Sequence, residues 1–187
     1  LSEGLVDKSS EVRVAVVEAL GFVGGSSAIT VLSGALADKS AEVRLRTVEA
    51  LKDAGTIAAI PSLQKAFQDK EESVRLRAAL MLRKIGHRNG VPVLAQAILN
   101  DRSDAVRSTA TRYLGSIGVK DGRSVGILTR ALEDKSPAVR IRAVESLGFV
   151  QMPSAISALQ RALEDPHLGV RICATEVMGR VLAKDFE

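Results

Sequence analysis

Few residues in this sequence have the chemistry of a catalytic or metal-binding site. The chain holds two histidines, His87 and His167, and one cysteine, Cys173. The histidines lie far apart, and neither has a cysteine or an acid at the spacing of a zinc-ligand set. Cys173 lacks an adjacent His that could activate its thiol, and it falls on the expected outer side of a helix. We therefore expect no catalytic residue, no metal site and no cofactor.

A glycine pair could in principle bind phosphate, but its surroundings favour another interpretation. Gly24 and Gly25 occur outside any Gly-rich phosphate-loop motif. They follow an apolar helical pattern, where glycine accepts the left-handed geometry that ends a helix. We interpret the pair as a helix stop and turn.

The one recurring chemical pattern joins an acid to an arginine. Asp-x-x-x-x-Val-Arg occurs at Asp7/Arg13, Asp38/Arg44, Asp69/Arg75, Asp101/Arg107, Asp134/Arg140 and Asp165/Arg171. Successive arginines are 31, 31, 32, 33 and 31 residues apart. An Asp at a helix start accepts backbone N–H groups and can pair with an Arg one turn further on. We expect these residues, here called the Asp–Arg ladder, to stabilise turns and not to reach a ligand.

The steady period indicates a chain of stacked repeats, each with two helices. Three, seven and ten residues after each Arg the side chain suits a helix core, as in Val16, Leu20 and Val23. This spacing predicts a helix that we call helix B. Its N-cap is serine in four repeats: Ser9, Ser40, Ser103 and Ser136. Glycine stands at its expected end in four repeats: Gly24, Gly55, Gly86 and Gly118.

A shorter apolar pattern lies before each Asp and predicts a first helix, helix A, for example Ile29, Leu32 and Leu36. Pro61 and Pro92 fall inside this pattern, where proline kinks or restarts a helix. The repeat that contains Pro92 has one extra residue before Asp101. We therefore expect a local irregularity near residues 99–100.

The composition agrees with tightly packed helices. Hydrophobic residues make up 46% of the chain and aromatic residues only 3%, so small aliphatic side chains must fill the core. A single cysteine excludes an internal disulfide, and no apolar run reaches the ~18 residues of a membrane span. With no signal-peptide pattern, we expect a cytoplasmic protein. The net charge of +4 is too small to indicate nucleic-acid binding by itself.

The repeated Asp and Val-Arg, the Pro eight residues before Asp69 and the period of about 31 residues resemble a known family. They are similar to the short HEAT-like repeats of phycobilisome-lyase-related subunits, and the resemblance covers the whole chain. It implies a ladder of Asp and Arg along the turns and a concave surface lined by helix B. HEAT-like repeats include scaffolds, lyase subunits, regulators and DNA glycosylases. One Tyr and four Phe offer few surfaces for stacking bases, which argues against the glycosylases.

We therefore predict an all-α fold, a right-handed α-α superhelix of about six HEAT-like hairpins with a truncated first hairpin. The expected organisation is one array over residues 1–187, divided near 1–24, 25–55, 56–86, 87–118, 119–151 and 152–187. Leu1 and Leu5 align with Leu32 and Leu36, so the sequence begins inside a helix A. We expect a fragment of a longer protein whose apolar N-terminal end promotes self-association.

The binding surface is expected at positions two, five, eight and nine after each Arg, which face away from the core of helix B. Arg46 and Arg142 each have a Glu three residues on, a satisfied surface pair. In repeats three and four, Leu80 and Arg112 replace that Glu. This predicts a central basic strip for an acidic protein segment, with a plain solvated face as the alternative. The strip consists of Arg46, Arg77, Leu80, Arg83, Lys84 and Arg112.

The predicted function is a protein-binding scaffold that holds its partner along helix B and is not an enzyme. Two alternatives stay open: a lyase-type subunit resembling phycobilin lyases, and nucleic-acid binding through the basic strip. A change in visible absorbance on incubation with a bilin would indicate the first. Steep salt dependence of DNA or RNA binding would indicate the second.

Overall fold

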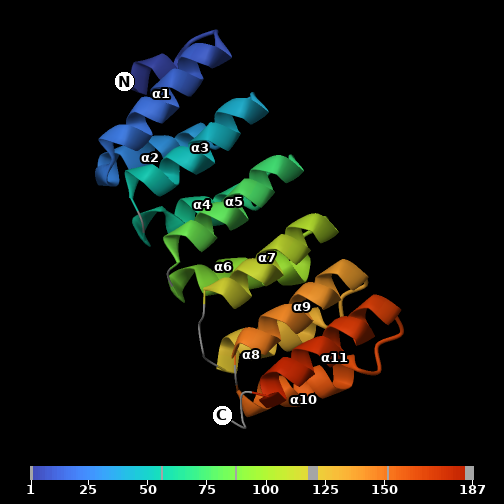
Figure 1. Cartoon of the computed structure of the whole chain (residues 1–187). Coiled ribbons are helices and arrows are strands. Elements are labelled where there is room, and N and C mark those ends of the chain that lie inside the picture. Colours follow the sequence, from blue (N-terminus) through green and yellow to red (C-terminus); the bar gives the residue numbers. More distant parts are fainter. Residues whose placement is uncertain (1, 56, 87, 118–121, 151, 184–187) are drawn as a thin grey trace. The chain divides into compact units, whose positions relative to one another are not determined.

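The computed structural model describes residues 2–55, 57–86, 88–117, 122–150 and 152–183. Every regular element in these ranges is a helix (Figure 1). The chain divides into two compact units, Leu1–Gly90 and Val91–Glu187, which we call the N-terminal and C-terminal units. The predicted all-α repeat architecture is confirmed.

In the N-terminal unit the B helices lie side by side, and shorter A elements pack against them. The B helices are α1 (Ser10–Val23), α3 (Ala41–Ala54) and α5 (Glu72–Ile85). The A elements are η1 (Ser2–Val6), α2 (Gly25–Ala35), η2 (Ile57–Ala59) and α4 (Ile60–Ala66), where η marks a 3-10 turn. A further 3-10 turn is η3 (Arg88–Gly90). α3 contacts both α1 and α5, so the B helices form one layer of this unit.

The C-terminal unit has the same alternation of helices. Its B helices are α7 (Asp104–Ser116), α9 (Pro137–Val150) and α11 (Leu168–Ala183). Its A helices are α6 (Val91–Asn100), α8 (Gly122–Ala131) and α10 (Pro153–Ala162). α9 contacts α7 and α11 within the B layer and α8 and α10 in the A layer.

Aliphatic side chains between the two layers form the core. The leucine seven residues after the Arg is buried in five repeats: Leu20, Leu51, Leu82, Leu114 and Leu147. The first repeat departs from the pattern at position ten, where Val23 is 67% exposed. Only the five-residue η1 stands there in place of a full helix A, so less of α1 is covered.

The predicted helix ends agree with the structure where it describes them. Ser9 and Ser103 accept the N–H groups of Val12 and Val106 at the starts of α1 and α7. Gly24 and Gly86 end α1 and α5 with φ angles of 70° and 63°, a region that favours glycine. Three other predicted helix ends differ or lie outside the described residues. Ser40 makes no side-chain cap bond, Gly55 is extended at φ 175°, and Gly118 lies outside the described residues.

Proline and the extra residue act on the A helices in different ways. Pro61 and Pro92 lie in the first turns of α4 and α6, each of which follows a 3-10 turn, so both prolines restart a helix as predicted. The irregularity expected near residues 99–100 takes the form of a longer helix end. α6 simply continues to Asn100, and the Asp101 N–H donates to the Ala97 carbonyl four residues back, at 3.0 Å. In the turns after α2, α4, α8 and α10, the N–H of the ladder Asp instead donates to the carbonyl three residues back.

Candidate functional site

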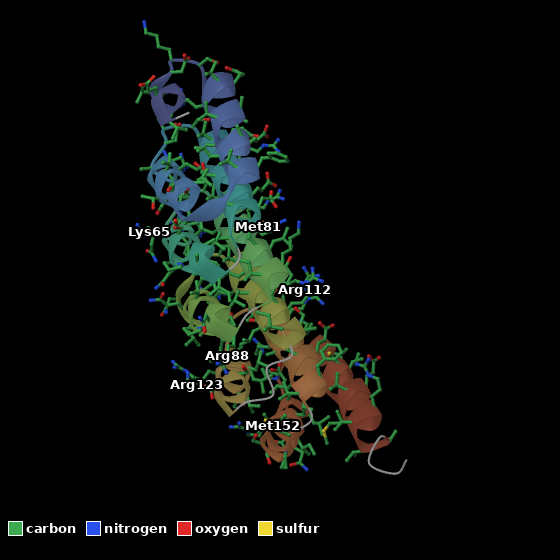
Figure 2. The ribbon with its side chains drawn as sticks, turned by 90° about the vertical axis from the view of Figure 1, so that its left-hand side faces the viewer. Lys65, Met81, Arg88, Arg112, Arg123 and Met152 are labelled. Atoms are coloured by element: carbon green, nitrogen blue, oxygen red, sulfur yellow. The ribbon has the colours of Figure 1, made fainter. Side chains whose placement is uncertain are left out.

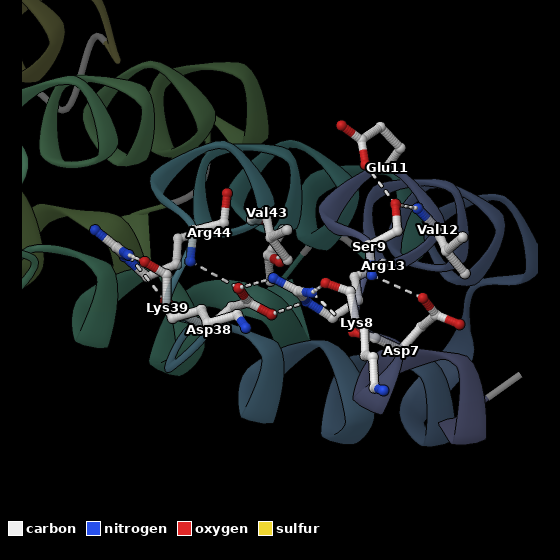
Figure 3. A network of polar contacts seen from close by, with 12 residues as sticks. Asp7, Lys8, Ser9, Glu11, Val12, Arg13, Asp38, Lys39, Val43 and Arg44 are labelled. Atoms are coloured by element: carbon white, nitrogen blue, oxygen red, sulfur yellow. Dashed lines mark hydrogen bonds and ion pairs between the residues drawn. The ribbon is translucent and has the colours of Figure 1, made fainter.

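The Asp–Arg ladder joins neighbouring repeats. Arg13 Nε and Nη2 donate to the two carboxylate oxygens of Asp38, at 2.7 and 2.9 Å (Figure 3). Its Nη1 donates to the backbone carbonyl of Asp7 at 2.8 Å. The predicted pairing of each Arg with the carboxylate of its own turn was wrong. The side chain is long enough to cross to the next repeat, while its own turn offers backbone carbonyls instead of the carboxylate.

The same geometry recurs at three more junctions of the described units. The arginine to carboxylate pairs are Arg44 with Asp69, Arg107 with Asp134 and Arg140 with Asp165, with Nε to Oδ2 distances of 2.6, 2.7 and 2.7 Å. In each repeat the Asp also accepts a backbone N–H two residues on, as Asp134 does from Ser136 at 2.8 Å. Arg75 and Arg171 make the contact to their own turns, each through Nη1 at 2.8 Å.

Burial and pairing set the charge state of the ladder. Burial alone would raise the pKa of Asp134, but the hydrogen bonds from Arg107 and from the Ser136 N–H outweigh it and lower that pKa. The pKa of Asp38 is lowered chiefly by its hydrogen bond from Arg13. Because these guanidinium groups are buried and bonded on both sides, they hold the repeats together and are not available to a ligand.

The arginines of the predicted basic strip are paired in the N-terminal unit. Arg46 bonds Glu42 at 2.7 Å and Glu49 at 3.3 Å. Arg77, expected to lack an acid because Leu80 stands three residues on, bonds the other oxygen of Glu49 at 2.7 Å. The expectation of unpaired cations here was wrong, because it considered partners only within one helix. Glu49 bridges α3 and α5.

The remaining members of the strip divide between the two units. Leu80, Arg83 and Lys84 lie on α5, and both basic side chains are exposed. Arg112 lies on α7 in the C-terminal unit, with its Cζ 4.9 Å from the centre of the Tyr113 ring. Figure 2 labels Arg112 on the B helices and, in the N-terminal unit, Lys65 on the A-helix side. Five of the six residues therefore belong to the N-terminal unit, and Arg112 belongs to the C-terminal unit.

Position eight after the Arg does not face a groove in every repeat. A side chain at Gly21 would lie 2.8 Å from the Cβ of Ala50 on α3, and one at Gly115 would lie 2.5 Å from Ser146 on α9. Both glycines are buried. Their predicted position on the outer surface was wrong. They lie where one B helix packs directly on the next.

Position nine is exposed, and it displays the largest apolar side chains of the B helices. Phe22 at the end of α1 is 94% exposed, and Phe149 at the end of α9 is 70% exposed. Together with position two and position five, these residues form what we call the B-helix face of each unit. Position nine, and with it both phenylalanines, belongs to the binding surface expected from the sequence, but neither residue was among the six of the basic strip. The repeated Leu-Gly-Phe-Val at 20–23 and 147–150 was the available signal.

The family model for HEAT repeats matches this sequence over residues 1–83, 29–114, 60–129 and 125–185. The chain belongs to the HEAT repeat family. The predicted resemblance is thus confirmed, and the ladder described above is the device that links consecutive HEAT repeats in this chain.

Solved structures with the same fold come from proteins of different kinds. Human deoxyhypusine hydroxylase in complex with glycerol is 21% identical with a TM-score of 0.59, over 97% of this chain and 83% of that chain. The complex of CpcE and CpcF of phycocyanin lyase from Nostoc sp. PCC7120 is 19% identical with a TM-score of 0.62, over 81% and 98%. Computationally designed armadillo repeat proteins for modular peptide recognition are 17% identical with a TM-score of 0.55, over 95% and 97%. At these identities the likeness shows the fold alone. A search of curated proteins by sequence finds no match.

The HEAT repeats show no arrangement typical of an active site in the part of the chain that the structure describes. No group of three or more His, Cys, Asp or Glu side chains there could hold a metal ion. Cys173 is half-buried on α11, and burial raises the pKa of its thiol, which disfavours the reactive thiolate. No described helix is long and apolar enough to cross a membrane.

Proposed function

We propose that this HEAT repeat chain is a protein-binding module that holds its partner on the B-helix faces and performs no catalysis itself. The observation that supports the proposal is the exposure of Phe22 and Phe149 at the same repeat position, one in each unit. An exposed aromatic ring amid polar side chains is a favoured anchor for a protein partner, because its burial removes a large apolar area from water.

The rest of each face is suited to hold such an anchor in place. Ladder arginines bond two consecutive turns, so neighbouring B helices are fixed to each other within a unit. On α3 and α5 the chain of pairs from Glu42 through Arg46 and Glu49 to Arg77 orders the polar part of the face. A partner therefore meets a surface that is ordered before binding, which lowers the entropy lost on association.

The charge pattern favours a protein over a nucleic acid. Arg46 and Arg77 are each bonded to glutamates, whose carboxylates would repel a phosphate backbone. Nucleic-acid binding gains most of its affinity from arginines and lysines that meet phosphates directly. An acidic partner segment was predicted because unpaired cations were expected in the basic strip. Since Arg46 and Arg77 are both paired with glutamates, that prediction has lost its support. Apolar contact with the phenylalanines takes its place as the main interaction.

Selection from a displayed library of random peptides on the whole chain tests the proposal. The enriched peptides are then measured against a double variant, Phe22→Ser with Phe149→Ser. We expect at least about a tenfold loss of affinity, since truncating an interface anchor costs about 2 kcal/mol.

A matched double variant controls for the loss of exposed apolar surface as such. Ile57 and Leu163 are 44% and 37% exposed and lie in or beside A elements, so Ile57→Ser with Leu163→Ser should leave the affinity unchanged. Equal binding to the wild type and to the phenylalanine variant would show that the partner binds elsewhere.

A further inference from the structure

One surface element occurs twice in this chain, once in each unit. Aligned on their ladder arginines, residues 9–23 and 136–150 share nine positions, including Glu18 with Glu145 and Phe22 with Phe149. The other repeats have no Phe at position nine, where Asp53, Lys84, Ser116 and Arg180 stand. We call Glu18/Phe22 and Glu145/Phe149 the Glu–Phe elements.

Folding explains most of the shared positions but not the phenylalanines. Leu20 is 6% exposed and Leu147 is 1% exposed, so both belong to the core. A side chain at Gly148 would lie 2.5 Å from Val177 on α11, just as one at Gly21 would meet α3. Phenylalanine is a mediocre helix former, and a ring that is mostly exposed adds little to packing. Its recurrence beside the same Glu therefore calls for a role outside the fold.

Each element combines an apolar and an anionic group on one helical face. Residues four apart in an α-helix lie one above the other, so each Glu stands one turn from its Phe. A partner side chain that packs on the ring can thus place a neighbouring ammonium or guanidinium group against the carboxylate. Such a charge-assisted hydrogen bond would orient the partner along the helix.

The two elements differ in how free the carboxylate is. Glu145 bonds Arg142 on its own helix at 2.7 Å. In the first repeat the residue equivalent to Arg142 is Ala15, which offers no cation. Arg46 on the neighbouring helix α3 is held by Glu42 and Glu49. A cationic partner group therefore competes with a direct ion pair at Glu145. At Glu18 the described residues form no ion pair, and Arg46 acts on its carboxylate only through its charge.

We propose that the chain binds two copies of one short motif, one on each Glu–Phe element. The motif has a large apolar side chain that packs on the Phe ring and a Lys or Arg that pairs with the Glu. This inference rests on the proposed function and specifies its partner. The element of the N-terminal unit binds the motif more tightly, because Ala15 stands three residues before its Glu, where Arg142 pairs with Glu145 in the other element.

The test is titration calorimetry of the whole chain with a peptide enriched in the selection described above. We expect two peptides per chain for the wild type, one for Phe22→Ser, one for Phe149→Ser, and none for the double variant. The site that remains in Phe149→Ser should be the tighter one. Circular dichroism of each variant checks that the exposed substitutions leave the helices intact.

Charge reversal tests the second half of the motif. Glu18→Lys in the Phe149→Ser background should weaken binding about tenfold, and a peptide with its Lys changed to Glu should restore it. Ser26→Lys, which introduces the same side chain at an exposed position in α2, should have no effect.

Three results would overturn the inference. One peptide per wild-type chain, dependence on only one of the two phenylalanines, or equal binding of the Lys and Glu peptides would each contradict it. Dependence on a single Phe would leave the proposed function standing. Binding that depends on neither phenylalanine would contradict the proposed function as well.

Discussion

At the scale of single residues, the ladder arginine is bonded on both of its edges. One edge of the Arg107 guanidinium meets both oxygens of Asp134, and the other meets the carbonyls of Asp101 and Arg102. The planar, five-donor guanidinium fits this double role, whereas the compact ammonium of lysine could not reach both turns. The residue therefore stabilises its own turn and the junction to the next repeat at once.

Replacing Arg107 should be strongly destabilising. Arg107→Ala leaves the nearly buried carboxylate of Asp134 without its partner, which costs about 3 kcal/mol of unfolding free energy. Urea denaturation measures the loss. Arg130→Ala removes an exposed Arg of α8 in the same unit and should cost less than about 0.5 kcal/mol. Equal losses for the two variants would contradict the structural role of the ladder.

The pH dependence of the unfolding free energy provides an independent test of the pair of Arg107 and Asp134. Arg107 lowers the pKa of Asp134 in the folded state, so the stabilisation is present above the unfolded-state pKa of about 4. It is lost as the pH falls through the lower folded-state pKa. The difference between wild type and Arg107→Ala should therefore shrink below about pH 4. A difference that stays constant to pH 2 would show that the lost packing of the Arg side chain, and not the charge pair, accounts for the effect.

At the scale of helices, glycine decides how closely two B helices approach. Gly115 and Ser146 bring α7 and α9 together, and the Ser146 hydroxyl donates to the Thr111 carbonyl at 3.1 Å across that contact. At the same repeat position α3 has Lys52, a half-exposed side chain that pairs with Asp53. One position thus serves helix packing in some repeats and the polar surface in others.

Adding a methyl group at two glycines of the C-terminal unit should have opposite effects. Gly115→Ala places a Cβ 2.5 Å from Ser146 and 2.9 Å from its backbone, so α7 and α9 must separate, at about 1–3 kcal/mol. Gly126→Ala on α8 meets no atom within 4 Å and should stabilise by about 0.5–1 kcal/mol, because alanine favours the helix. Thermal unfolding separates the two outcomes. A stabilising Gly115→Ala would mean that these helices are not in close contact.

At the scale of the molecule, most contacts join a repeat to its immediate neighbours. Within each unit, the ladder bonds and the contacts between B helices join adjacent repeats. For example, α9 contacts α7, α8, α10 and α11. In such arrays the stability is close to a sum of repeat and nearest-neighbour terms. A local change should therefore have local consequences.

Hydrogen exchange should reveal this locality. Gly115→Ala is expected to increase amide exchange in α7 and α9 and to leave α1 and α3 close to wild-type protection, since α1 and α3 belong to the other compact unit. Hydrogen exchange is monitored by peptide mass spectrometry. Each protein is measured at the same interval below its own melting temperature. A uniform increase from α1 to α11 would instead indicate one cooperative unit, contrary to the expected nearest-neighbour behaviour.

The sequence by itself determined the repeat architecture and most helix ends. The 31-residue period, the helical spacing of residues such as Leu51 and Leu82, and the glycine stops at Gly24 and Gly86 are local signals. They act through backbone geometry and through burial of one helical face, so no knowledge of distant partners is needed. The same reasoning placed Phe22 and Phe149 on the surface of helix B.

Only the tertiary structure decided which residues are partners. Arg13 bonds the carboxylate of Asp38 and only the backbone carbonyl of Asp7, Arg77 bonds Glu49 of the preceding repeat, and Gly21 faces a neighbouring helix. Each outcome depends on the distance and rotation between two packed helices. Spacing along one chain segment contains no such information, because long side chains reach across repeats as easily as along one.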